Sequence, residues 1–315
     1  MSQTNITVVG SINIDLVFRT PRMPKSGETL CGHEFLQIAG GKGANQAVAA
    51  ARQGAQVHMV ACVGNDSHGT LSLRGLEAES IASDLITITS AAPTGVAGIF
   101  VDDAGNNSIV IAAGANALLS TAHIDAARSS ILTSKLLICQ LETPLATVEY
   151  AIQLAYNASI PVIFNPAPVC PLSDALLAQV SYLIVNETEA EQLSGIAVTD
   201  YTSAQLASTR LRTRGAKVVL LTMGAQGLCI TDANASRIYP AIKVCVIDST
   251  AAGDTFVGAF ADATARGLAL DDACNEAQYA AALAVTRIGA QPSIPYRQDV
   301  IKFMDTTAQQ QQQQQ

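Results

Sequence analysis

The segment Asp248–Phe256, with the sequence Asp-Ser-Thr-Ala-Ala-Gly-Asp-Thr-Phe, places one carboxylate, Asp254, directly after a small glycine-containing turn. An apolar helical pattern at 255–265 follows it at once. The first N–H groups of a helix have no partner within the helix and lie at the positive end of its dipole. The backbone amides of residues 251–253 could therefore face a phosphate while Asp254 removes a proton from an attacking hydroxyl. A residue that only caps the helix explains the same pattern without any chemistry.

A second glycine-rich segment, Gly40–Gln46 (Gly-Gly-Lys-Gly-Ala-Asn-Gln), separates a strand pattern from a helix pattern. It does not match a Walker A loop, because Leu36 stands at the first glycine position and Gly43 follows Lys42 where Ser or Thr is needed. It does not match the Rossmann fingerprint either, because Gln46 replaces the third glycine. What remains is a turn where the backbone approaches a ligand, with the lysine and asparagine as polar contacts, or an ordinary tight turn.

Polar side chains recur where predicted strands end. Asn13 and Asp15 alternate with apolar residues, so both face the same way from one extended segment. A carboxylate beside an amide can bind neighbouring sugar hydroxyls. Ligands of open α/β sheets bind at the carboxyl ends of the strands, and several polar ends together favour a binding site over ordinary exposed polar residues. The other predicted strand ends are at Glu142, Asn165–Pro168, Asn186–Glu191 and Thr222–Gly227.

Short β-rich runs alternate with helical patterns over most of the chain. This alternation predicts an α/β fold with a central, mostly parallel sheet and helices on both faces. Strands are expected at 6–9, 57–63, 136–140, 162–164, 182–185 and 218–222, and helices near 44–52, at 146–155, from 187 and at 203–214.

Two regions break the alternation and predict a small antiparallel β lid. Residues 16–18 with 29–36, and 94–101 with 107–111, have strand patterns joined by turn-rich links, the clearest turn being 102–106. The lid strands are thus drawn from about 12–36 and 94–112. A lid of this kind excludes water from a site at the strand ends, or forms an interface if its outer face is apolar.

Composition restricts the possible partners and domain organisation. The net charge of −8 and the pI near 4.9 argue against nucleic acid or an anionic membrane as the principal partner. No basic segment precedes an apolar run at the N-terminus and no run approaches a membrane span, so we expect a cytoplasmic protein. The seven cysteines and four histidines show no metal-ligand spacing, which argues against a structural zinc site. We expect one domain over 1–308 and a disordered, low-complexity poly-Gln tail over 309–315.

Taken together, these motifs resemble the ribokinase family of carbohydrate kinases, over about residues 5 to 304. The resemblance implies a ribokinase-like fold and ATP-dependent phosphorylation of D-ribose at the 5-hydroxyl, giving ribose 5-phosphate. The most specific matches are Gly40–Ala50, Asn186–Glu191, Thr250–Phe256 and Ala284–Pro295.

The resemblance also implies roles for individual residues. Asp254 is the expected base, and the amides of Ala252 and Gly253 form the anion hole. The expected sugar-binding residues are Asn13, Asp15, Gly41, Lys42, Asn45 and Glu142. The expected ATP-binding residues are Asn186, Thr222, Gly224, Gly227 and Gly253, with Glu189 near Mg²⁺. The expected ligands of an activating monovalent cation, K⁺, are Asp248, Thr250, Ala284, Arg287, Gly289 and Ser293.

Several features leave the substrate and assembly open. Ser249 departs from the usual Thr of the family, and Thr222–Gly227 matches only in its glycines. The family also includes kinases for 2-deoxyribose, fructose and nucleosides, and Asp15 favours a sugar with vicinal hydroxyls. A silent sugar-binding regulator is the remaining alternative, although Asp254 and Gly253 are both present. A homodimer through the lid sheet is the family expectation.

Overall fold

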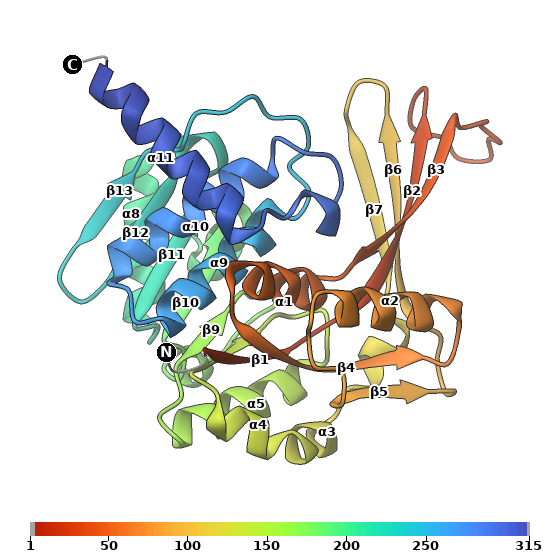
Figure 1. Ribbon diagram of the computed structural model, residues 1–315, viewed down its shortest axis with the longest axis horizontal. Coiled ribbons are helices and arrows are strands. Elements are labelled where there is room, and N and C mark those ends of the chain that lie inside the picture. Colours follow the sequence, from red (N-terminus) through yellow and green to blue (C-terminus); the bar gives the residue numbers. More distant parts are fainter. Residues whose placement is uncertain (1–3, 314–315) are drawn as a thin grey trace.

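The computed structural model describes residues 4–313, and within them a nine-stranded sheet forms the centre of the molecule (Figure 1). Its strand order is β13-β12-β11-β10-β9-β8-β1-β4-β5. Every neighbouring pair from β5 to β11 is parallel, whereas β12 and β13 add an antiparallel edge. The strands are β1 (Asn5–Val9), β4 (Gln56–Gly64), β5 (Ile86–Thr89), β8 (Leu136–Cys139), β9 (Val162–Phe164), β10 (Tyr182–Asn186), β11 (Val218–Thr222), β12 (Leu228–Thr231) and β13 (Ser236–Tyr239).

Helices cover both faces of this sheet, as the alternating pattern predicted. Strand β1 shows why: Ile6 and Val8 contribute to one buried cluster, and Val9 contributes to the other. One face is packed by α1 (Lys42–Gln53), α2 (Ser67–Ala78), α9 (Ala252–Ala265), α10 (Leu270–Ala284) and α11 (Arg297–Gln313). The other is packed by α3 (Thr121–Ala126), α4 (Arg128–Thr133), α5 (Leu145–Asn157), α6 (Asp174–Leu177), α7 (Glu187–Ser194) and α8 (Tyr201–Thr213). Short 3₁₀ helices lie at Gly114–Leu118, Gly224–Gln226 and Gln291–Ser293.

The expected small sheet is present and projects from the main body as a separate blade (Figure 1). Its order is β3-β2-β6-β7, and both outer pairs are antiparallel, whereas β2 and β6 run parallel in the middle. The strands are β2 (Asn13–Thr20), β3 (Glu34–Gly40), β6 (Gly95–Asp102) and β7 (Asn107–Ala112). We call this sheet the lid.

Several elements differ from the sequence prediction. The strand expected at 29–36 is wrong in position: β3 covers Glu34–Gly40, because it pairs with β2 from Arg19 to Asn13 and this long-range pairing outweighs local composition. Helix α9 begins at Ala252, three residues earlier than expected. The tail was expected to be disordered, but α11 continues to Gln313, because extending an existing helix avoids the cost of nucleation. Residues 314–315 lie outside the described part of the chain.

Between residues 4 and 313, no helix combines the length and apolar character needed to cross a bilayer.

Candidate active site

Close packing of α1 against α9 brings the two functional segments together. A side chain at Gly258 of α9 would lie 2.6 Å from Gln46 O, so only glycine permits this approach. Asn45 Nδ2 then donates to Asp254 Oδ2 at 3.0 Å, and Gln46 Nε2 donates to Asp254 Oδ1 at 3.0 Å. The carboxylate of Asp254 is buried, and both of its oxygens accept a hydrogen bond from a side-chain amide.

The start of α9 is open at Gly253, the residue before Asp254. Ala251 adopts a left-handed conformation with φ of 59° and precedes the helix, so Asp254 is the third helical residue and not its cap. The space beside Gly253 is open, since an added Cβ would meet no atom within 4 Å. The amide of Ala252 instead donates to Ser249 O at 3.2 Å, so only part of the expected anion hole is free in this conformation.

Asn13 and Asp15 lie on the same face of β2 at its first residues, and both side chains are buried. Glu142, three residues beyond β8, faces them: its Oε2 accepts from Ser11 Oγ at 2.6 Å, Asn13 Nδ2 at 3.3 Å and Lys42 N at 3.1 Å. The structure therefore brings Asn13, Asp15 and Glu142 together. A pocket of about 310 Å³ opens beside Asn13 and Glu142.

Asn116, which the sequence reading missed, fixes the position of Asn13. Its Oδ1 accepts from Ile12 N at 2.9 Å, and its Nδ2 donates to Ile12 O at 3.0 Å and to Asn13 Oδ1 at 2.7 Å. The side chain thus replaces a strand partner for Ile12 and fixes which way the Asn13 amide points. Ser11 plays a similar part, because its Oγ donates to Glu142 and accepts from Gly43 N at 3.2 Å. No spacing in the sequence reveals either contact, since both join distant segments.

Carboxylates dominate the electrostatics of the site. Burial, together with the nearby charges of Glu142 and Asp254, raises the pKa of Asp15 to about 7. Burial works against the charge of Lys42, but the surrounding carboxylates outweigh it and raise its pKa. Burial also raises the pKa of Glu189. Lys42 is therefore the cation that all these acids share, and it stays charged.

The expected nucleotide residues lie at the carboxyl ends of β10 and β11. Asn186 and Thr222 are paired across these parallel strands. Asn186 also caps α7 and forms a reciprocal capping box with Glu189, which holds both side chains at the helix start. Gly224 and Gly227 both have positive φ, and a side chain at Gly227 would collide with Tyr239 O. The glycine frame is therefore needed for the turn itself.

The expected ligands of the monovalent cation come from two neighbouring segments. Asp248 Oδ1 accepts from Thr250 N at 2.9 Å and Thr250 Oγ1 at 2.6 Å, while its Oδ2 accepts from Gly289 N at 2.8 Å. Asp248 N donates to Val285 O at 3.2 Å, which ties the segment to the end of α10. Arg287 N donates to Ala284 O at 3.0 Å, and Ser293 Oγ donates to Ala290 O at 2.8 Å. Oxygen donors with a single carboxylate fit a monovalent cation.

The donors present also fit a Mg²⁺ ion that arrives with phosphates. Mg²⁺ is usually held by one or two carboxylates together with substrate phosphates and water. Glu189 and Asn186 offer such oxygens at the edge of the site. Within residues 4–313, no group of three or more His, Cys, Asp or Glu side chains is arranged to hold a metal.

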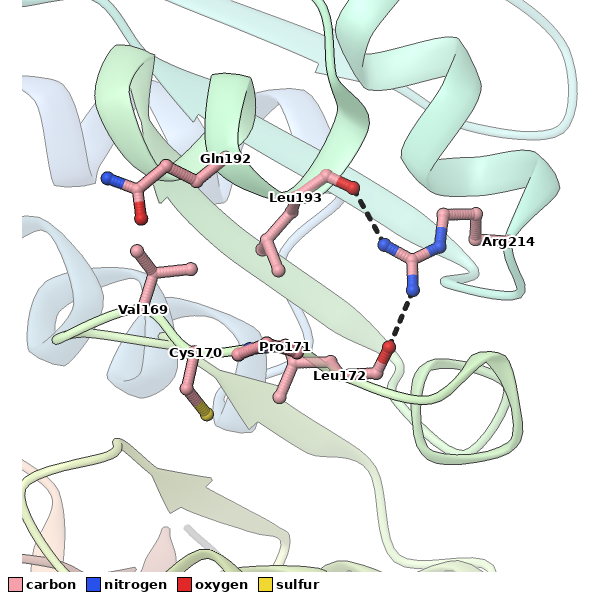
Figure 2. Close-up of a pocket in the computed structure, with 7 residues that line it drawn as sticks. All are labelled: Val169, Cys170, Pro171, Leu172, Gln192, Leu193 and Arg214. Atoms are coloured by element: carbon pink, nitrogen blue, oxygen red, sulfur yellow. Dashed lines mark hydrogen bonds between the residues drawn. The ribbon is translucent and has the colours of Figure 1, made fainter.

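A second pocket, of about 290 Å³, lies between the loop after β9 and the end of α7, and none of the expected site residues lines it (Figure 2). Arg214 crosses its edge, donating to Leu193 O at 2.7 Å and to Leu172 O at 2.6 Å. Its Nε also donates to Asp174 Oδ1 at 2.7 Å. These bonds tie three segments together, so Arg214 has a structural role here.

Comparison with known proteins identifies the family. A model described as pfkB family carbohydrate kinase matches residues 3–297. The chain belongs to this family. Among curated members of the pfkB family, a ribokinase from Haemophilus influenzae is 44% identical over 95% of this chain and 98% of its own length. A deoxyribokinase from Salmonella typhi is 37% identical over 92% of this chain and 95% of its own.

Solved structures of the family agree with this fold. The Arabidopsis thaliana ribokinase complexed with ribose and ATP has a TM-score of 0.89 at 30% identity, covering 96% of this chain and 98% of that one. The α/β fold with a small lid sheet and the membership in a family of carbohydrate kinases are thus both confirmed.

Proposed function

We propose that this chain phosphorylates D-ribose at its 5-hydroxyl with ATP, giving ribose 5-phosphate. One observation carries the proposal: Asp254 is a buried carboxylate in the first turn of α9, next to the open space at Gly253, and it lies close enough to Asp15 for its charge to raise the pKa of that group. The high identity to curated ribokinases and the likeness to a ribokinase that binds ribose and ATP support this choice of substrates.

The chemistry follows from where each group lies. The sugar hydroxyls are held by the polar side chains of Asn13, Asp15, Lys42, Asn45 and Glu142, with the backbone at Gly41 close by. Asp254 accepts the proton of the 5-hydroxyl as that oxygen attacks the γ-phosphoryl group, a contribution of about 10²- to 10⁴-fold in rate. The free amide of Gly253 faces the charge that spreads over the phosphoryl oxygens in the loose transition state.

The nucleotide and ions are assigned to the remaining expected residues. ATP would bind at the ends of β10 and β11, held by Asn186, Thr222, Gly224 and Gly227. Glu189 lies where it can contact the Mg²⁺ bound with ATP. Mg²⁺ neutralises charge on the β- and γ-phosphates when it is bound. K⁺ would bind the oxygens at Asp248, Thr250, Ala284, Arg287, Gly289 and Ser293, next to the anion hole.

The assembly and domain organisation belong to the same proposal. We infer a homodimer through the lid, because Ile109, Val110 and Ile111 on β7 are all exposed and apolar. Such side chains on an edge strand need a cover. We also treat residues 1–308 as a single domain, because helices from across this range pack on one continuous sheet.

A 2-deoxyribose kinase is the second candidate, and the similarity to a deoxyribokinase favours it. The two differ in one hydroxyl. A buried carboxylate that loses a hydroxyl partner is penalised, so Asp15 and its neighbours should discriminate against the deoxy sugar.

The deciding experiment measures ADP release with D-ribose, 2-deoxyribose and fructose, with and without potassium. We expect the highest kcat/KM with D-ribose, stimulated by potassium. Asp254→Asn should bind D-ribose with nearly unchanged affinity while kcat falls by about 10²-fold or more. A preference for 2-deoxyribose would support the second candidate, and near wild-type turnover in Asp254→Asn would remove Asp254 as the base.

A further inference from the structure

Gln46 lies at the centre of a buried chain of side-chain amides that ends on Asp254. Its side chain has no solvent exposure. Its Nε2 donates to Asp254 Oδ1 at 3.0 Å and to Asn165 Oδ1 at 3.1 Å, and its Oε1 accepts from Gln140 Nε2 at 2.6 Å. Both ends of the Gln46 amide are therefore engaged inside the protein.

The neighbours of Gln46 decide which end of the amide faces the carboxylate. Asn165 Nδ2 donates to Ile184 O at 3.0 Å, so its oxygen is turned toward Gln46. A reversed Gln46 amide would place its oxygen against Asn165 Oδ1 and Asp254 Oδ1, three acceptors without a proton between them. The amide nitrogen must therefore face Asp254, and it holds that oxygen from the interior side.

The two oxygens of Asp254 consequently have different surroundings. Oδ1 meets the fully buried Gln46, whereas Oδ2 meets Asn45, a residue of the proposed sugar group. We propose that Gln46 is a positioning residue for phosphoryl transfer: it holds Oδ1 on the interior side so that Oδ2 is the oxygen presented to the sugar hydroxyl. This inference rests on the proposed function, because it takes Asp254 to be the base.

In the proposed step, the proton moves from the sugar hydroxyl to Asp254 Oδ2 while the phosphoryl group moves from ATP to the sugar oxygen. The O–H bond of the sugar hydroxyl breaks as Oδ2 takes the proton, the new O–P bond forms, and the bond from the γ-phosphorus to the leaving ADP oxygen breaks. A hydrogen bond to a carboxylate favours its charged form and limits its rotation. A base that is free to rotate spends less time in the reactive geometry, and small misplacements can cost about 10²-fold in rate.

The test compares two glutamines of the same helix. Gln53 is also buried in α1, but its Nε2 donates to Pro295 O at 2.9 Å and not to Asp254. In Gln46→Met we expect the single-turnover rate at saturating ATP and D-ribose to fall by about 10- to 100-fold. The KM for D-ribose should change much less, and the acidic limb of the rate profile should move to higher pH. Gln53→Met should lower Tm while leaving the rate and its pH profile unchanged.

Gln46→Glu provides a second, isosteric test that does not depend on the methionine variant being stable. A glutamic acid beside Asp254 would share a proton with it, as paired carboxylates do. When protonated, the new carboxyl can donate to Asp254 Oδ1 as the glutamine amide does, but when ionised it cannot. The variant should therefore lose activity as the pH rises, so that its pH–rate profile becomes bell-shaped with a new descending limb. If the profiles of both Gln46 variants match wild type, Gln46 does not position the base.

The same measurements separate failure of this inference from failure of the proposed function. Near wild-type turnover in Asp254→Asn would remove the base itself, and with it the reason to position it. Collapse of turnover in Asp254→Asn with an unchanged profile in both Gln46 variants would leave the base in place and overturn only the role of Gln46.

Discussion

Asp15 carries the charge in this site that is most sensitive to pH near neutrality. Its pKa of about 7 lies well above the ordinary 3.8 because it is buried among other carboxylates. A group whose folded-state pKa is raised contributes stability that is fully present below pH 3.8 and is lost as the pH rises through 7. The protein is therefore less stable at neutral and higher pH, where the buried Asp15 carboxyl becomes charged.

We predict that Asp15→Asn raises Tm at pH 8 and changes it little at pH 4. Each unit of pKa shift corresponds to about 1.4 kcal/mol, so the gain at pH 8 should amount to a few kcal/mol at most. Thermal melts across this pH range measure it, and KM for D-ribose should rise in the same variant. Asp232→Asn is the opposite control: Arg237 lowers the pKa of Asp232 to about 2, so this variant should lose stability at pH 8. If the difference in Tm between Asp15→Asn and the wild type is the same at pH 4 and pH 8, the burial of Asp15 does not raise its pKa.

The sequence indicates candidate residues for the site but not their contacts. Asn13 and Asp15 could be singled out because they alternate with apolar residues, and Glu142 because it follows a predicted strand. Gln46 and Asn116 could not, because their partners Asp254 and Ile12 lie far away in the chain. A glutamine in an alanine-rich helix has no local signature of its role.

At the scale of elements, α1 depends on a glycine at each end. Gly41 precedes the helix with φ of 90° and Gly54 ends it with φ of 115°. Both conformations are unfavourable for any residue with a Cβ. Only Gly41 is also crowded, because a Cβ there would lie 2.7 Å from Asn13 N, whereas one at Gly54 would meet only Arg297 Nη1 at 4.0 Å.

This difference predicts separate effects on stability and binding. Gly41→Ala and Gly54→Ala should each lose about 1–2 kcal/mol of stability from backbone strain. Gly41→Ala should in addition raise KM for D-ribose by about 10-fold or more, because α1 and the start of β2 must move apart. Denaturant melts and initial rates on both variants check this. An equal KM in the two variants would show that the contact between Gly41 and Asn13 does not matter for the sugar.

The elements expected from the sequence have the predicted type, but several of their boundaries differ. The alternating strands and helices follow from local composition. The start of α9 depends on Ala251 adopting a left-handed φ of 59°, a conformation rare for alanine that no local rule would assign. The position of β3 likewise depends on its pairing with β2.

At the scale of the molecule, the exposed apolar strand β7 predicts association. Val110 is 70% exposed at the middle of this strand. Val110→Asp should therefore convert a dimer into a monomer, because a charge in an apolar interface loses its hydration. Light scattering after size exclusion measures the mass. Leu206→Asp is the matched control, since Leu206 is 57% exposed on α8 and should not affect the mass. A monomeric wild-type protein would refute the homodimer.

Strand β2 begins with Asn13 and Asp15, the residues proposed to bind the sugar, and then continues as an inner strand of the lid. No hinge within the strand separates the two parts, because its pairing with β6 runs without interruption from Asn13 to Thr20. A tilt of the lid should therefore also move the side chains of Asn13 and Asp15. The first residues of the strand lie in the site, and the rest of it lies in the lid. If the proposed dimer forms through the lid, a lid movement in one subunit would be transmitted directly to Asn13 and Asp15 of the other subunit.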